Sequence, residues 1–414
     1  MLRVLSFFLS LLPLTLAAQF TRSYASNIRS LQMEANERFE APPVLTLGSD
    51  DEILFSFDEL SHTYHRYTYR LVHCAADWSA SELMPIDYLE GFNDRPIDDW
   101  QNSENTTQLY TRYQFYLPNE DVAPKVSGNY KVEIYDDEAD DASPVAVFGF
   151  AVVEPRVRLE ARVSSDTEID RNSTHQQLSF VVDYAGYNIS SPVTDVKVRV
   201  FQNRRLDNFV EDIKPTYVTA DRLEYVHNKG LIFDAGNEYR RFELTDPHRP
   251  GMNVERVSFL DPHYHAELYA DAPSRSYSNV RDENGRFYTN TLEGYGSTIE
   301  ADYALVHFRL DAPYRSGGNY YLLGDYWGNV FTDNNILVYD YAEGAYLSSQ
   351  LMKFGVHNYR YVWLPEGARK ALTATAEGDF FNTENEYLIF VYHREFGGRY
   401  DKLIAVQQIN FSYR

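Results

Sequence analysis

The chain has 414 residues, of which 61 are acidic and 38 basic, giving a formal charge of −23. A surface of this charge repels phosphate backbones and anionic lipid headgroups, so nucleic-acid binding is a poor first hypothesis. The single cysteine, Cys74, can form neither an intramolecular disulfide nor a cysteine-based zinc or iron–sulfur site. Aromatic residues make up 15% of the chain, with 34 Tyr and 25 Phe against 4 Trp, and this excess of large rings favours strands over helices.

The N-terminus has the features of a secretory signal peptide. Arg3 precedes an apolar stretch from Val4 to Leu16, and small residues follow at Ala17 and Ala18. The apolar stretch is shorter than the roughly 20 residues that span a bilayer. We therefore expect a cleaved signal peptide over residues 1–18 and export of the mature chain. No later apolar run reaches that length, so we expect no direct transmembrane segment.

Alternation of apolar and polar residues predicts a first series of strands before residue 155. The strands are expected at residues 53–57, 65–73, 109–117, 129–135 and 145–153. Glu154-Pro155 ends the series because proline cannot donate to a β-ladder. Residues 75–105 show little alternation, and an irregular stretch of this length is usually functional or an ordered surface loop. We expect an N-terminal β-sandwich domain over residues 19–154.

Further strands at the spacing of a β-sandwich fill the rest of the chain. They are expected at residues 156–163, 177–184, 193–201, 224–233, 239–244, 254–260 and 263–269, and then, after a polar stretch at 271–298, at 305–310, 320–324, 336–341, 345–353, 357–364, 386–393 and 403–411. We predict an all-β protein with three consecutive sandwich domains, the second over 155–302 and the third, early-set-like, over 303–414. The alternation alone would also fit an outer-membrane barrel, but long irregular stretches interrupt the strands and favour sandwiches.

No residue pattern predicts a catalytic site. His73 and Cys74 are adjacent on a predicted strand and should point to opposite faces, so the imidazole could not activate the thiol. Cys74 is better interpreted as a small buried apolar residue. Gly294–Thr298 has two glycines but neither the lysine nor the following helix of a phosphate-binding loop. We predict no enzymatic activity, no cofactor and no catalytic residue.

Two groups of histidines invite comparison with metal sites. One group is His62, His65 and His73, and the other is the pair His263 and His265, which share a strand face with Asp261. We favour the interpretation that both groups are ordinary histidines of a tyrosine-rich sheet. Five of the six residues from 136 to 141 are acidic, but the run lacks the glycine of a calcium loop and is interpreted as a solvated hairpin tip. We predict no metal site.

One tryptophan suggests an alternative function. Residues 320–329 read YYLLGDYWGN, which is similar to the strand and loop that open starch-binding early-set sandwiches. An exposed Trp327 would stack on a sugar ring there and bind carbohydrate without catalysis. The simpler interpretation is that Trp327 packs at the edge of its domain. A secreted carbohydrate-binding or accessory protein is therefore the alternative hypothesis.

Several blocks in a fixed order resemble a known family. They are HCAADWSASELMPIDYLEGF (73–92), SGNYKVEIYDD (127–137), GGNYYLLGDYWGN (317–329), EGDFFNTENEYLIFVYHR (377–394) and GGRYDKLIA (397–405). Together the blocks resemble the plug protein of the type IX secretion system, and the resemblance extends from about residue 30 to the end of the chain. No block is a catalytic signature, so the ordered set carries the resemblance.

The resemblance implies an exported, non-enzymatic protein of Gram-negative bacteria. Such a protein would lie in the periplasm, at the periplasmic face of the outer membrane. Its partner would be the large outer-membrane β-barrel translocon of the system, whose opening it would block when no cargo is engaged. A plug must leave when cargo arrives, so we expect a transient contact of about 1,200 Å² or a little more rather than an obligate apolar interface. Residues 75–105, with their aromatics, are the predicted contact region.

Overall fold

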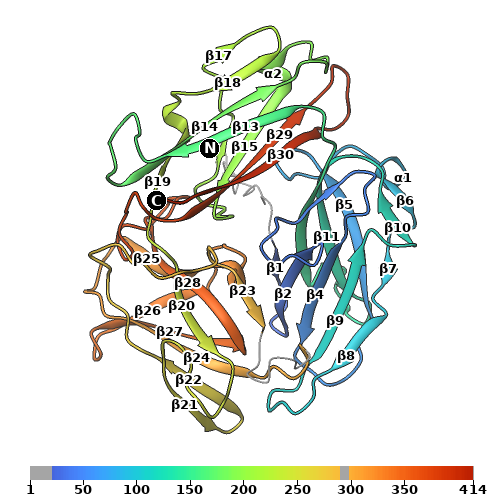
Figure 1. The fold of residues 1–414 in the computed structure, drawn as a ribbon. Coiled ribbons are helices and arrows are strands. Elements are labelled where there is room, and N and C mark those ends of the chain that lie inside the picture. The colour runs from blue at the N-terminus through green and yellow to red at the C-terminus, as the bar shows by residue number, and fades with distance from the viewer. Residues whose placement is uncertain (1–20, 290–297, 414) are drawn as a thin grey trace, which may run out of the picture.

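The computed structural model describes residues 21–289 and 298–413. Nearly all of the regular structure is strand (Figure 1). The helices of the described residues are single turns: α1 (Pro85–Tyr88), α2 (Pro192–Asp195), η1 (Lys229–Leu231) and η2 (Asp325–Trp327). The predicted all-β class is confirmed. The expected signal peptide and most of Gly294–Thr298 lie outside the described residues.

An N-terminal lobe (residues 21–153) packs two antiparallel sheets over an aromatic core. One sheet has the order β1 (Arg22–Ser23), β12 (Ala146–Val153), β11 (Gly128–Asp136), β5 (Tyr67–Cys74), β7 (Arg95–Pro96), and β3 (Val44–Thr46) pairs in parallel with β12. The other has the order β2 (Ile28–Ala35), β4 (Ile53–Glu59), β9 (Thr111–Leu117), β8 (Asp99–Asn102). Phe55 of β4 stacks on Phe115 of β9 and meets Phe148 of β12 edge to face, which joins the two sheets.

A middle lobe combines residues 158–234 with the end of the chain at residues 385–411. Its first sheet has the order β13 (Arg158–Ser164), β14 (His175–Asp183), β18 (Arg222–Tyr225), β17 (Tyr217–Val218), with β19 (Ile232–Asp234) also on β14. Its second sheet has the order β16 (Val210–Glu211), β15 (Val196–Gln202), β29 (Asn385–His393), β30 (Lys402–Phe411). The two sheets of this lobe therefore come from segments far apart in the sequence.

Strand β29 is buried on both faces, and this explains its nearly continuous apolar sequence NEYLIFVYH. Tyr387, Ile389 and Val391 point into the core of the middle lobe. Leu388, Phe390 and Tyr392 point the other way and pack with Ala151 and Val153 of the N-terminal lobe. A strand with two buried faces has no reason to alternate between apolar and polar residues. The same strand thus completes one lobe and joins it to another.

A third lobe (residues 240–365) is built on one long sheet that curls over itself. The order is β20 (Arg240–Leu244), β28 (Gly355–Pro365), β25 (Gly318–Leu323), β26 (Ile336–Asp340), β27 (Ala345–Lys353), β24 (Tyr303–Leu310), β22 (His263–Leu268), β21 (Val254–Leu260), with β23 (Phe287–Thr289) on β28. Four strands separate β20 from β24 in this order, yet Phe242 of β20 lies against Phe308 of β24. Strand β20 at one end of the sheet therefore faces β24 across the core.

The sheets do not follow the boundaries expected for the second and third domains. Strands β20, β21 and β22 precede residue 303 but pair with strands of the third lobe. Strands β29 and β30 lie within residues 303–414 but pair with β15 of the middle lobe. The division at 302/303 must therefore be corrected. Alternation identifies a strand from its own residues, whereas its partner is chosen by long-range packing.

The three lobes surround a common centre (Figure 1), and buried ionic contacts join the N-terminal lobe to the third lobe. The carboxylate of Asp58 in the N-terminal lobe lies 2.6 Å from Lys353 Nζ of the third lobe and 3.1 Å from Arg112 Nη1. The Tyr303 hydroxyl of the third lobe donates to Asp58 at 2.7 Å. Burial lowers the pKa of Lys353 to about 8, although the adjacent Asp58 opposes this shift. Such contacts require fixed geometry, because each buried charge depends on its partner.

No helix of the described residues has the length and apolar character needed to cross a membrane.

Candidate docking surface

The turn formed by α1 and the residues after it presents apolar side chains to solvent. Proline at the first position and the Asp87 carboxylate, which accepts from the Met84 N–H at 3.0 Å, fix the single helical turn. Met84 and Ile86 project outward, with 64% and 79% of their surfaces exposed. Lys125 Nζ donates to the Ile86 carbonyl at 2.9 Å and ties the turn to the body of the lobe. The turn is held in place by these contacts and by the buried Tyr88, yet Met84 and Ile86 are not buried.

Phe92 extends this apolar surface. It follows β6 (Leu89–Gly91), which pairs with β10 (Val122–Pro124), and 77% of its surface is exposed. Gly91 has a φ of +83°, and a Cβ there would lie 1.8 Å from the Asp121 carbonyl oxygen. Only glycine permits this close approach. The backbone turn at Gly91 therefore fixes the direction in which the chain presents Phe92.

A second segment, from the far end of the chain, reaches the same end of the molecule. Phe396 lies in the connection between β29 and β30 and is 99% exposed. Three residues later, Arg399 Nη1 pairs with Asp87 of α1 at 3.1 Å. Figure 1 shows α1 and the end of the β29–β30 hairpin together at the upper right. We call Met84, Ile86, Phe92 and Phe396 the docking face.

A polar groove of about 430 Å³ lies beside the docking face. Residues 75–82 form one side, and charged side chains of the middle lobe form the other. Asp401, buried at its base, accepts from the Ala76 N–H at 2.9 Å, from Arg394 Nε at 2.8 Å and from Lys197 Nζ at 3.1 Å. Burial alone would raise the pKa of Asp401, but these donors lower it below its ordinary value. The groove thus carries paired charges and fixes residues 75–82 against the middle lobe.

Comparison with known proteins decides the family. Residues 28–154 match the family model described as the first domain of the type 9 secretion system plug protein. The chain carries the first domain of this plug protein family. The matched residues are the N-terminal lobe, which carries three of the four side chains of the docking face.

One solved structure resembles the plug-family chain over nearly its whole length. It is the crystal structure of a hypothetical protein from Parabacteroides merdae, with 39% sequence identity and a TM-score of 0.93. The alignment covers 95% of this chain and 100% of the other. The search of curated proteins gave no match. The relative therefore supports the arrangement of all three lobes, and the family model supports a plug-like role in type IX secretion.

In this plug-family protein, His73 and Cys74 are structural residues, as the sequence predicted. His73 is buried, with Nδ1 2.8 Å from Ser81 Oγ, and burial lowers its pKa to about 4. Cys74 is buried on the opposite face of β5, and burial raises the pKa of its thiol to about 12. A neutral thiol that no base contacts cannot act as a nucleophile at ordinary pH. The interpretation of Cys74 as a small apolar core residue is confirmed.

The other predicted candidates lie in separate places. His62 contacts the Ser103 carbonyl at 2.9 Å, and His65 lies beside Tyr67, so neither joins His73. The acidic run is an exposed connection between β11 and β12, as predicted. Within residues 21–289 and 298–413, no three His, Cys, Asp or Glu side chains are already grouped for a metal ion. His265 does not share a site with Asp261 but lies against His307, which the sequence analysis did not consider.

Trp327 is a packing residue. It belongs to the single turn η2 and packs against the core of the third lobe, edge to face with Phe308. Its indole N–H donates to Gln350 Oε1 at 3.3 Å. These contacts hold the partly buried ring against the core. The interpretation that Trp327 packs at the edge of its lobe is confirmed.

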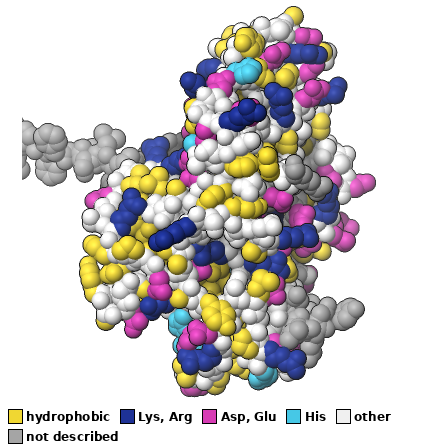
Figure 2. All heavy atoms as spheres, turned by 60° about the vertical axis from the view of Figure 1, so that its left-hand side comes forward, with side chains coloured by type: hydrophobic (Ala, Val, Ile, Leu, Met, Phe, Trp, Pro, Cys, Tyr) yellow, Lys and Arg dark blue, Asp and Glu magenta, His cyan; other side chains and the backbone are white. Residues whose placement is uncertain are grey.

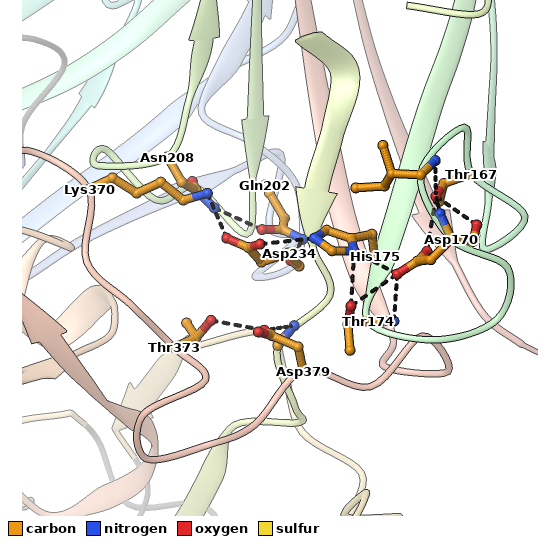
Figure 3. Close-up of polar contacts among 12 residues, drawn as sticks. Thr167, Asp170, Thr174, His175, Gln202, Asn208, Asp234, Lys370, Thr373 and Asp379 are labelled. Atoms are coloured by element: carbon orange, nitrogen blue, oxygen red, sulfur yellow. Dashed lines mark hydrogen bonds and ion pairs between the residues drawn. The ribbon is translucent and has the colours of Figure 1, made fainter. Parts of the chain in front are cut away.

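A polar cluster missed by sequence analysis ties the middle lobe to the loop after β28 (Figure 3). His175 lies between two carboxylates, with Nδ1 2.7 Å from Asp170 and Nε2 3.4 Å from Asp234. Lys370 of the loop reaches Asp234 at 2.6 Å, and Asp379 accepts from the Gly236 N–H at 2.9 Å. The Thr174 hydroxyl and the Asp170 carboxylate both contact Nδ1 of His175. Because Asp170 already engages this nitrogen, it is not a free base toward the Thr174 hydroxyl. The geometry suits attachment of the loop rather than catalysis.

Proposed function

We propose that this chain is a non-enzymatic plug of the type IX secretion system. It blocks the periplasmic opening of the large outer-membrane β-barrel translocon when no cargo is engaged. The observation that carries the proposal is the match of residues 28–154 to the plug family, because the matched lobe presents rigidly held apolar side chains to solvent. Blocking a wide opening needs a stiff body and a docking surface, and it needs no active site.

The docking face has the composition of a reversible contact. Four large apolar side chains are exposed, while the groove beside them carries paired charges. A small apolar centre with a polar rim is typical of transient interfaces, whereas obligate interfaces are larger and more apolar. On the face that Figure 2 shows, which is the left-hand side of Figure 1 and not the docking face, apolar and charged side chains are likewise interspersed. The plug can therefore leave when a cargo-bound translocon binds it less tightly than the empty one.

Charge supports a protein partner. The chain carries a net charge of −23, which disfavours adsorption to an anionic membrane surface. The same charge speeds association with a partner of opposite charge, and it adds little to the lifetime of the complex. We therefore place the apolar docking face against protein at the periplasmic end of the translocon.

Affinity purification from solubilised outer membranes tests the proposal. The tagged wild-type chain should recover a very large barrel protein. Phe92→Ser should weaken recovery, because removing an apolar side chain at the centre of an interface costs about 2 kcal/mol, roughly a 30-fold loss of affinity. Phe259→Ser is the matched control, since Phe259 is also an exposed phenylalanine, with 50% of its surface accessible, but lies on β21 of the third lobe. Failure of the wild-type chain to recover any barrel protein would refute the proposal, and equal loss with both variants would refute the docking face.

A further inference from the structure

Two histidines from adjacent strands face each other on the outer side of the third lobe. His265 of β22 and His307 of β24 lie on neighbouring parallel strands, and His265 Nδ1 is 2.9 Å from His307 Nε2. The ring centroids are 5.1 Å apart, with 20° between the ring planes. Both side chains are half-buried, so solvent reaches the pair. In Figure 2, histidine side chains are visible at the lower end of the molecule, the end where Figure 1 places β21 and β22.

The contact between the two rings directs the lone pair of one imidazole nitrogen at the other ring. Two imidazole nitrogens can approach to 2.9 Å only if something positive lies between them, and one shared proton meets this need. Ser349 Oγ of β27 lies 2.8 Å from His307 Nδ1 and orients the ring from behind. A hydrogen bond to the second ring nitrogen is the usual support of a metal-binding histidine.

A carboxylate lies within reach of the pair. Glu267 is two residues after His265 on β22, so both side chains leave the same face of the strand. It is also directly opposite His307 in the pairing of β22 with β24. Its carboxylate now pairs with Arg256 of β21 at 2.5 Å. A side-chain rotation away from Arg256 would bring a third donor to the two imidazoles.

We propose that His265, His307 and Glu267 bind a divalent transition-metal cation, with Zn²⁺ as the representative ion. Two imidazoles and one carboxylate are donors that Zn²⁺ accepts, with water in the remaining position. Tetrahedral coordination at about 2.05 Å per nitrogen places two nitrogens about 3.3 Å apart, so the pair needs to open by only a few tenths of an ångström. On binding, the ring that carries the shared proton takes a proton on its other nitrogen instead, so both imidazoles stay neutral and both facing nitrogens have a free lone pair. The ion then links β22 directly to β24.

Calorimetric titration of the purified mature chain with zinc chloride tests this proposal. We expect about one equivalent to bind, and we expect His265→Ala and His307→Ala each to abolish binding. Ser349→Ala should weaken binding by about 10-fold, because it removes the support of His307 without removing a ligand. Arg256→Ala should tighten binding, because it frees the Glu267 carboxylate, and Glu267→Gln should weaken it. All five substitutions lie on a solvent-facing surface, and a melting curve of each metal-free variant verifies that it is folded.

His263→Ala is the matched control. His263 is on the same face of the same strand as His265, but its neighbour across the sheet is Leu260 of β21 rather than His307. This variant should bind zinc as the wild-type chain does. The electron paramagnetic resonance spectrum of the chain with one equivalent of Cu²⁺ should show coupling to two nitrogens, and His307→Ala should lose this signal. The proposal is overturned if the wild-type chain binds no zinc, or if binding survives in both His265→Ala and His307→Ala.

Discussion

Asp58 makes a buried ionic contact between the N-terminal and third lobes. It is fully buried and faces two cations, Lys353 and Arg112, together with the Tyr303 hydroxyl. An amide at this position would keep the shape of the side chain but remove its charge. Both cations would then remain buried without a counter-ion, and a loss of this kind typically costs about 3 to 5 kcal/mol.

We therefore expect Asp58→Asn to lower the free energy of unfolding by about 3 to 5 kcal/mol in denaturant titrations. Asp94→Asn is the matched control. Asp94 pairs with Arg70 at 3.1 Å, but both side chains are about half exposed, so its loss should cost less than about 1 kcal/mol. Equal effects of the two substitutions would show that the buried contact does not hold the lobes together.

Glu238 gives the stability of the protein a defined dependence on pH. Burial, with a contribution from the negative charge of Asp282, raises the pKa of Glu238 to about 7 from an ordinary value of 4.5. The native state therefore holds this proton more tightly than the unfolded chain does. The contribution of Glu238 to stability is complete below about pH 4.5 and is lost as the pH rises to about 7.

Glu238→Gln should remove this part of the pH dependence. As the pH rises from about 4.5 to about 7, the melting temperature of the wild-type chain should fall relative to that of the variant. His73 and His357, whose pKa values burial lowers to about 4, act in the opposite direction but do so equally in both proteins. Parallel curves for the two proteins would contradict the raised pKa of Glu238.

At the scale of elements, β29 links the fold of one lobe to its contact with another. It lies between β15 and β30, and its two faces pack into two different apolar clusters. A chain ending at Glu384 should therefore lose the middle lobe and expose apolar surface of the N-terminal lobe. We expect lower strand content by circular dichroism and strong binding of a hydrophobic dye. A chain ending at Phe411 retains β30 and should behave as wild type.

A different result for the chain ending at Glu384 would be informative. If it melted cooperatively, with the strand content expected for three intact lobes, β29 and β30 would be an accessory to the middle lobe. Pairing of β15 with β29 would then contribute little to the stability of that lobe.

Individual strands could be predicted from the sequence, but the partners of those strands could not. Strand β24, for example, contains the predicted residues 305–310, because its residues 306, 308 and 310 are buried while 305, 307 and 309 are partly exposed. The predicted strand at 224–233 is interrupted by η1, which Asn228 begins by accepting from the Gly230 N–H. The pairing of β29 with β15 joins residues nearly two hundred positions apart, and no local pattern encodes it.

The docking face, too, could be predicted from the sequence only in part. The sequence directed attention to residues 75–105, and Met84, Ile86 and Phe92 of that stretch are exposed. Phe396 was not foreseen, because an exposed phenylalanine in a hairpin connection looks like any other loop residue until the hairpin is placed beside α1. The contact of His265 with His307 is equally non-local, since strand pairing alone brings the two rings together.

The whole molecule is an assembly of three lobes joined at buried polar and apolar contacts rather than by flexible linkers (Figure 1). The Ala76 N–H donates to Asp401 between the N-terminal and middle lobes, and Arg286 pairs with Glu386 at 2.7 Å between the third and middle lobes. With Asp58 and Lys353, each pair of lobes has at least one buried polar contact. Such a body keeps its shape under load, which is the property that blocking an open channel requires.

The conductance of the purified translocon in a planar lipid bilayer tests the central claim most directly. Addition of the wild-type chain to the periplasmic side should close most of the open channels, and Phe259→Ser should act as the wild-type chain does. Phe92→Ser should need roughly 30-fold more protein for the same block. An unchanged conductance at concentrations of wild-type chain that saturate its binding to the translocon would contradict the account.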